Sequence, residues 1–84
     1  TNIFFVSKDK IVTPPVSSGL LNGVLRQHIM KIANVEERII RPENIGEFTE
    51  IFITNSLLGV MPVKRFGEQI FNSRNITNKL IAEY

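Results

Sequence analysis

Two short apolar runs, Ile3 to Val6 and Ile51 to Ile53, constrain the fold of this chain most strongly. Each is continuously apolar, which is typical of a strand that is covered on both faces. After a short polar stretch, Ile11 to Thr13 returns as another strand, so the N-terminal segment predicts a β-hairpin. Pro14 and Pro15 end this hairpin, because proline cannot donate a hydrogen bond to a neighbouring strand.

The rest of the chain mixes helical and strand patterns. Apolar residues recur at helical spacing from Leu21 to Ile32 and predict one long helix that ends near Ala33. Pro42 begins a short helical segment that extends to about Phe48, and a second short helix is expected over residues 77–84. Further strands are expected over residues 35–40, 50–54, 60–66 and 69–71. This order predicts an α+β fold, with a mixed β-sheet or half-barrel, one long helix and two short ones.

The composition excludes several classes of protein. With 84 residues the chain forms one domain at most. Ten Lys and Arg against eight Asp and Glu are scattered along the chain, so no basic stripe predicts a nucleic-acid partner. There is no cysteine for disulfide or thiolate chemistry, and one histidine cannot form a metal site. No run has the length of a membrane span and none resembles a signal peptide, so a cytoplasmic protein without a membrane partner is expected.

A polar triplet, Thr54-Asn55-Ser56, interrupts the apolar sequence between Ile51 and Val63. Small uncharged groups at the end of a buried strand, with apolar sequence on both sides, are typical of a ligand site. A strand end at which Asn55 and Ser56 cap an ordinary turn explains the same residues.

A second candidate site lies at the start of the long helix, in the sequence GLLNGVLR. Gly23 stands where this helix is expected to begin, and the amides of Val24 and Leu25 have no acceptor within the helix. Such amides, together with the helix dipole, suit a phosphate group that glycine allows to approach closely. A glycine that serves only the geometry of the helix start is the alternative.

The two candidate sites occur together in one known family. The segments TNIFFV, TPPV, GVLR and TNSLLGVMPV follow one another in the order found in the C-terminal region of the fold-type IV pyridoxal-phosphate enzymes. The chain resembles this family from Thr1 to about Phe66. The family includes branched-chain and D-amino-acid aminotransferases and aminodeoxychorismate lyase. Its aminotransferases tend to carry Thr-Gly-Thr or Ser-Thr-Ser at the triplet, so this chain looks more similar to the lyase.

The resemblance implies a cofactor and its phosphate ligands. The backbone amides of Val24 and Leu25, beside Gly23, would bind the phosphate of pyridoxal phosphate, and the hydroxyl of Ser56 would bind the same group. Several fixed donors of this kind suit a dianionic phosphate.

The resemblance also implies a substrate site and a reaction. Asn55 and Leu57 would line the turn that meets the carboxylate of a small-molecule substrate. Residues 1–84 would be the C-terminal fragment of a homodimeric lyase that removes pyruvate from 4-amino-4-deoxychorismate to give 4-aminobenzoate. A D-amino-acid or branched-chain aminotransferase is the alternative within the family. A non-catalytic α+β interaction module is the alternative from another class.

The chain offers no candidate for the catalytic groups that this cofactor needs. Such chemistry requires a lysine that bonds the cofactor and an acid at its pyridine nitrogen. Every lysine here has the sequence context of a solvated surface, so both groups are expected upstream of Thr1 and the chain alone is expected to be inactive. Glu36, Glu37 and Glu47 are expected on solvated faces. Arg26 is expected on the helix surface or behind the site, and His28 is expected to be half-buried.

Overall fold

A mixed five-stranded sheet forms the centre of the fold. The computed structural model describes residues 2–8, 10–15, 24–55 and 59–83. The strands are β1 (Asn2–Ser7), β2 (Lys10–Thr13), β3 (Val35–Glu37), β4 (Glu50–Asn55) and β5 (Gly59–Pro62). Their order across the sheet is β3-β2-β1-β4-β5, with β2 and β3 parallel and the other pairs antiparallel. The predicted α+β class, the mixed sheet and the N-terminal hairpin are confirmed.

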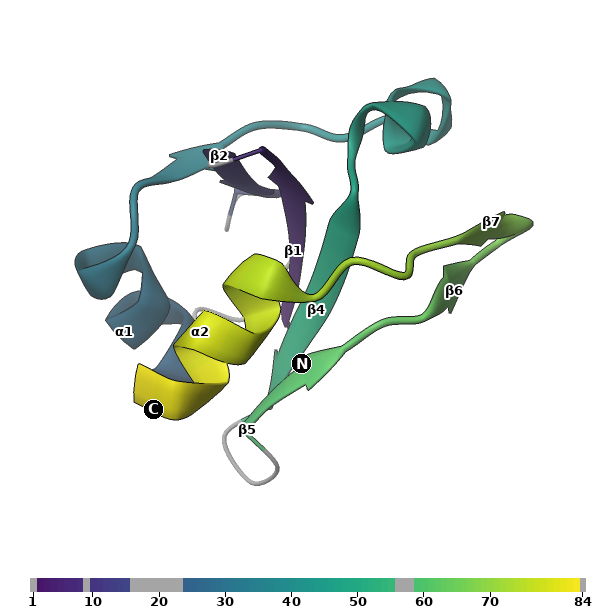
Figure 1. Cartoon of the computed structure of the whole chain (residues 1–84). Coiled ribbons are helices and arrows are strands. Elements are labelled where there is room, and N and C mark those ends of the chain that lie inside the picture. Colours follow the sequence, from purple (N-terminus) through teal and green to yellow (C-terminus); the bar gives the residue numbers. More distant parts are fainter. Residues whose placement is uncertain (1, 9, 16–23, 56–58, 84) are drawn as a thin grey trace.

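The remaining elements lie around this sheet (Figure 1). They are the helices α1 (Val24–Ile32) and α2 (Asn75–Glu83), the 3₁₀ helix η2 (Pro42–Glu47) and the short strands β6 (Arg65–Phe66) and β7 (Gln69–Ile70). Figure 1 shows the β6–β7 ribbon extending away from the two α-helices. The helix predicted to be long is described over nine residues, the same length as α2. No helix in the described ranges is long and apolar enough to cross a membrane.

Strands β1 and β4 are covered on both faces, as their apolar runs predict. Phe4 and Phe52 face α1 and α2 and belong to one buried cluster, in which their rings stack with centroids 4.9 Å apart. Phe5 and Ile51 point to the opposite face and join a second cluster with Phe48. Because neighbouring residues of a strand point to opposite faces, each of these strands contributes to both clusters.

Helix α1 presents a narrow apolar stripe to the sheet. Leu25 and Ile29, four residues apart, are 3% and 1% exposed. His28 is exposed, so the prediction that it is half-buried is wrong, since the described part of the stripe does not extend to its position.

Helix α2 begins against a buried carboxylate. The backbone N–H groups of Ile76 and Thr77 donate to the two carboxylate oxygens of Glu50, at 3.1 and 3.0 Å, and the Thr77 hydroxyl donates at 3.0 Å. The first amides of a helix have no acceptor within it, and a negative charge there also complements the helix dipole. Glu50 of β4 therefore caps α2 from far away in the sequence. The helix begins at Asn75, slightly earlier than predicted.

Three segments differ from their sequence-based predictions. The strand predicted over residues 35–40 ends at Glu37. The amide of Arg38 makes the last hydrogen bond to β2, at Thr13, and the two prolines that follow Thr13 have no N–H group to continue the pairing. The strand predicted over residues 60–66 is two strands, β5 and β6, since the amide of Val63 bonds to Ile51 near the start of β4 and β6 then pairs with β7. The helical segment that begins at Pro42 is present, with the tighter 3₁₀ hydrogen bonding.

Candidate cofactor site

The first turn of α1 has the features of an anion site. The helix begins at Val24, and its first turn contains no acidic residue. In the helix as described, from Val24 onward, the amides of Val24 and Leu25 lack acceptors, and no carboxylate of this turn offsets the positive end of the helix dipole. Gly23 lies outside the described residues, so its predicted role stays a prediction.

Leu25 fixes this turn against the sheet. Its side chain is buried in the cluster that also contains Phe52 of β4 and Val60 of β5. Val60 is the cross-strand partner of Thr54, the first residue of the polar triplet. The structure thus anchors the start of α1 in the same cluster as the β4–β5 hairpin that carries the second candidate site.

Asn55 is the last residue of β4. It pairs with Gly59, which has a φ of 85° and begins β5 after the turn. Glycine adopts this conformation without the strain that a side chain would cause. Strand alternation directs Thr54 to the face of α1 and Asn55 to the opposite face. The roles predicted for Asn55, Ser56 and Leu57 stay predictions, because the turn that would bring these residues together lies outside the described residues.

The first residue of the triplet belongs to a buried polar pair between β1 and β4. Asn2 of β1 is the cross-strand partner of Thr54, and both side chains are buried. Among the described residues, Oδ1 of Asn2 finds no hydrogen-bond donor. A buried acceptor of this kind suits an N–H or O–H group and repels a phosphate. Asn2 therefore does not add to the phosphate ligands predicted at the start of α1.

Arg26, which was expected on the helix surface or behind the site, is buried. Its side chain is 2% exposed, and Nη2 donates to the carbonyl of Pro14 at 3.1 Å and to Oε2 of Glu37 at 3.2 Å. The helix surface is excluded, because β3 returns beside β2 and brings Glu37 to the helix, and the position behind the site stays a prediction. The acidic pair Glu36-Glu37 in a predicted strand was the only sequence signal for such a partner.

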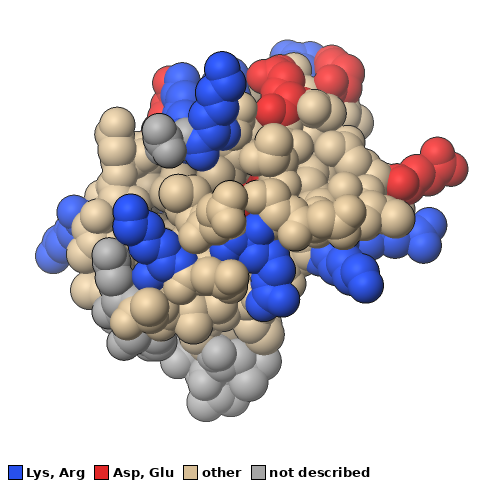
Figure 2. Space-filling model, in the orientation of Figure 1, with Lys and Arg blue, Asp and Glu red and all other residues tan. Residues whose placement is uncertain are grey.

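The lysines and the other acids singled out in the sequence are exposed, as predicted. Glu36, Glu37 and Glu47 all have solvent-accessible side chains, although Glu37 also pairs with Arg26. The exposed lysines are Lys8, Lys10, Lys31, Lys64 and Lys79. Figure 2 shows Lys and Arg side chains spread over one face without a continuous stripe. Among the described residues, no three His, Asp or Glu side chains gather into a possible metal site.

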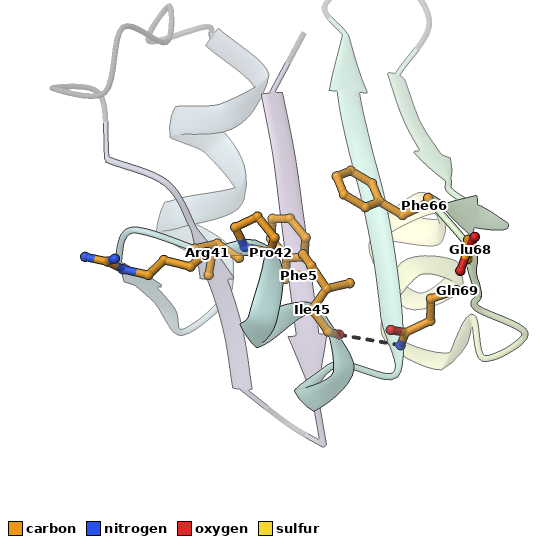
Figure 3. A pocket seen from close by; sticks show the side chains of 9 residues that line it. Phe5, Arg41, Pro42, Ile45, Phe66, Glu68 and Gln69 are labelled. Atoms are coloured by element: carbon orange, nitrogen blue, oxygen red, sulfur yellow. Dashed lines mark hydrogen bonds between the residues drawn. The ribbon is translucent and has the colours of Figure 1, made fainter.

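A cavity of about 450 Å³ lies on the other face of the sheet (Figure 3). Gln69 donates to the carbonyl of Ile45 at 3.5 Å across its wall, and the guanidinium of Arg41 points away from it. The residues that line it are Phe5, Ile40, Arg41, Pro42, Ile45, Phe66, Gly67, Glu68 and Gln69. Sequence reasoning missed this cavity, because its walls come from β1, η2 and the β6–β7 ribbon, which are distant in the sequence.

The α+β arrangement recurs in solved enzyme structures, one of which contains pyridoxal phosphate. The chain superimposes on an aminotransferase from Brucella abortus, bound to the cofactor pyridoxal phosphate, with a TM-score of 0.87 and 29% identity over 98% of this chain and 31% of that one. It superimposes on a structure from Legionella pneumophila, named as a 4-amino-4-deoxychorismate lyase, with a TM-score of 0.89 and 28% identity over 98% of this chain and 33% of that one.

Sequence comparison identifies the family. Residues 1–66 match the family described as amino-transferase class IV, and the chain belongs to this family. It is also 37% identical, over 84% of its length, to a protein of Thermotoga maritima named as a branched-chain-amino-acid aminotransferase, of which it covers 28%. The chain therefore spans about a third of the length of its relatives. Enzymes of this family use pyridoxal phosphate, as the Brucella abortus structure illustrates.

Proposed function

We propose that residues 1–84 form the part of a pyridoxal-phosphate enzyme that binds the cofactor's phosphate, and that the complete enzyme is a branched-chain aminotransferase. The observation that carries the first part is the start of α1, whose first turn contains no acidic residue of its own and is anchored in the same cluster as the β4–β5 hairpin, in a chain of this family. The reaction follows the relatives at 37% identity, which are named as branched-chain-amino-acid aminotransferases. The aminotransferase reaction replaces the lyase reaction that the sequence alone favoured, because the names of the relatives support the lyase less well.

Each proposed ligand has a physical role at the phosphate. The amides of Val24 and Leu25 donate along the axis of α1, and Gly23 leaves room for the approach of the anion. Ser56 donates its hydroxyl from the end of the β4–β5 hairpin. The buried side chain of Leu25 keeps the amides in place, so little ordering remains to be done when the phosphate binds. When bound, pyridoxal phosphate supplies an electron sink for the chemistry at the amino acid.

The substrate side is proposed at the same turn. Asn55 and Leu57 line the path of the substrate carboxylate, while the catalytic lysine and the acid at the pyridine nitrogen come from outside residues 1–84. The complete enzyme is proposed to be a homodimer of which this chain is a C-terminal fragment.

A lyase that releases pyruvate from 4-amino-4-deoxychorismate is the second candidate. Asn55 favours it, because it stands at the centre of the triplet where the aminotransferases tend to carry Gly or Thr. The similarity to the Legionella pneumophila structure supports the same reading.

The two reactions are separated by their products. The purified complete enzyme is supplied either with L-leucine and a 2-oxo acid or with 4-amino-4-deoxychorismate. Formation of a new amino acid from L-leucine supports the aminotransferase, whereas release of pyruvate and 4-aminobenzoate supports the lyase. D-leucine in place of L-leucine tests the D-amino-acid aminotransferase alternative. If the complete protein binds no pyridoxal phosphate, both enzyme candidates are wrong and the non-catalytic interaction module is the remaining alternative.

A further inference from the structure

We propose that Arg26 is a positioning residue, which holds the first turn of α1 so that the amides of Val24 and Leu25 meet the cofactor's phosphate. This inference rests on the proposed phosphate site and assigns to it a residue that does not touch the phosphate. Its basis is the contact of one buried guanidinium with two neighbouring strand ends.

The contacts of Arg26 join three segments of the chain. In the parallel pair of β2 and β3, Thr13 lies opposite Glu37. Pro14 directly follows Thr13, so it lies at the same end of the paired strands as Glu37. Nη2 of Arg26 reaches both of them, at 3.1 Å to the Pro14 carbonyl and 3.2 Å to the Glu37 carboxylate. One guanidinium nitrogen thus ties the start of α1 to the adjacent ends of two paired strands.

The contacts of Arg26 restrict the movement of the first turn of α1. Arg26 is the third residue of the helix and follows Leu25 directly. Leu25 anchors the turn through the apolar cluster, and Arg26 anchors it through charge-assisted hydrogen bonds. A rotation of the turn would break these bonds and leave a guanidinium buried without them, which is costly. The amides of Val24 and Leu25 are therefore held in one direction.

Stability alone explains the buried arginine poorly. Replacing a buried ion pair by apolar residues is often neutral for folding or even stabilising. A positive charge in the first turn of a helix also opposes the helix dipole. Both costs are offset when a dianionic phosphate binds at this helix start, so Arg26 fits a turn that is built to hold an anion.

The test compares pyridoxal phosphate with pyridoxal, which lacks the phosphate. The complete apoenzyme and its Arg26→Lys and Glu37→Gln variants are titrated with each ligand. We expect Arg26→Lys to weaken binding of pyridoxal phosphate by about tenfold, because misdirected donors lose most of a charge-assisted hydrogen bond, and to leave pyridoxal binding unchanged. We expect a smaller loss in Glu37→Gln, which keeps an acceptor of the same shape. Arg38→Gln is the matched control, because Arg38 is 44% exposed and pairs only loosely with Glu36, at 3.7 Å.

The outcomes separate the inference from the proposed function. If Arg26→Lys lowers only the melting temperature of the apoenzyme, or weakens both ligands equally, Arg26 is structural and the inference is wrong while the phosphate site stands. If the unmodified enzyme binds both ligands equally well, the phosphate site itself is wrong and the inference falls with it. Should Arg26→Lys fail to fold, Glu37→Gln decides, since it changes a carboxylate that is 43% exposed.

Discussion

Removing the hydroxyl of Ser56 tests whether this residue binds the cofactor's phosphate or belongs only to a turn. If it donates to the phosphate, Ser56→Ala removes a hydrogen bond to a charged group, worth roughly 1.5–3 kcal/mol. Titration of the complete apoenzyme should then show affinity for pyridoxal phosphate lower by about ten- to a hundredfold, with little change in a thermal melt. Ser18→Ala, in the segment before Gly19, is the control and should leave the affinity alone. Unchanged affinity in Ser56→Ala would make Ser56 a turn residue.

Single residues show where local sequence patterns stop being informative. The burial of Leu25 and Ile29 was predictable, because helical periodicity alone directs both to one face. The burial of Arg26 was not, because it depends on Glu37 arriving beside Pro14 through the parallel pairing of β3 with β2. A long-range contact of this kind leaves no periodic signal in the sequence. Polar residues in the core were therefore the least predictable part of the site.

At the level of elements, Glu50 links β4 to the start of α2. Glu50→Gln removes the negative charge that the amides of Ile76 and Thr77 share, and keeps one acceptor. We expect a loss of about 1–2 kcal/mol in the free energy of unfolding, as for a helix cap. Hydrogen exchange at the amides of α2 should accelerate first. Glu47→Gln, at an exposed carboxylate, is the control and should change stability by less than about 0.5 kcal/mol. Equal exchange rates in both variants would contradict the cap.

The stacked rings of Phe4 and Phe52 join the two central strands. Phe52 is fully buried, so Phe52→Ala should lower the free energy of unfolding by about 3–5 kcal/mol, through lost contacts and a cavity. Phe66→Ala is the control, since Phe66 is 42% exposed and should cost far less. Urea denaturation of the complete enzyme compares the two variants. A similar loss in both would mean that the β1–β4 pair is not the centre of the core.

For the whole molecule, the sequence predicted the elements better than their arrangement. Apolar runs and periodicity located β1, β2, β4 and α1, since these signals are local. The pairing of β1 with β4 lacks such a signal, because the two strands are joined only after a long excursion of the chain. The ends of β3 and β5 depend on where a neighbouring strand stops, so these bounds were wrong. The two halves of the candidate site were each visible as a motif, and the resemblance to the family was needed to connect them.

The placement of the lysines leads to a prediction for the chain as a whole. A lysine that bonds pyridoxal phosphate needs a desolvated site or a nearby charge that favours its neutral form. The five lysine side chains are all exposed, and Lys10 pairs with Glu36 at 3.3 Å. We therefore expect residues 1–84, mixed with pyridoxal phosphate, to show no saturable visible absorption band that survives dialysis, whereas the complete enzyme keeps its band. A stoichiometric band that resists dialysis would contradict this, and borohydride reduction followed by peptide mass spectrometry would identify the lysine responsible.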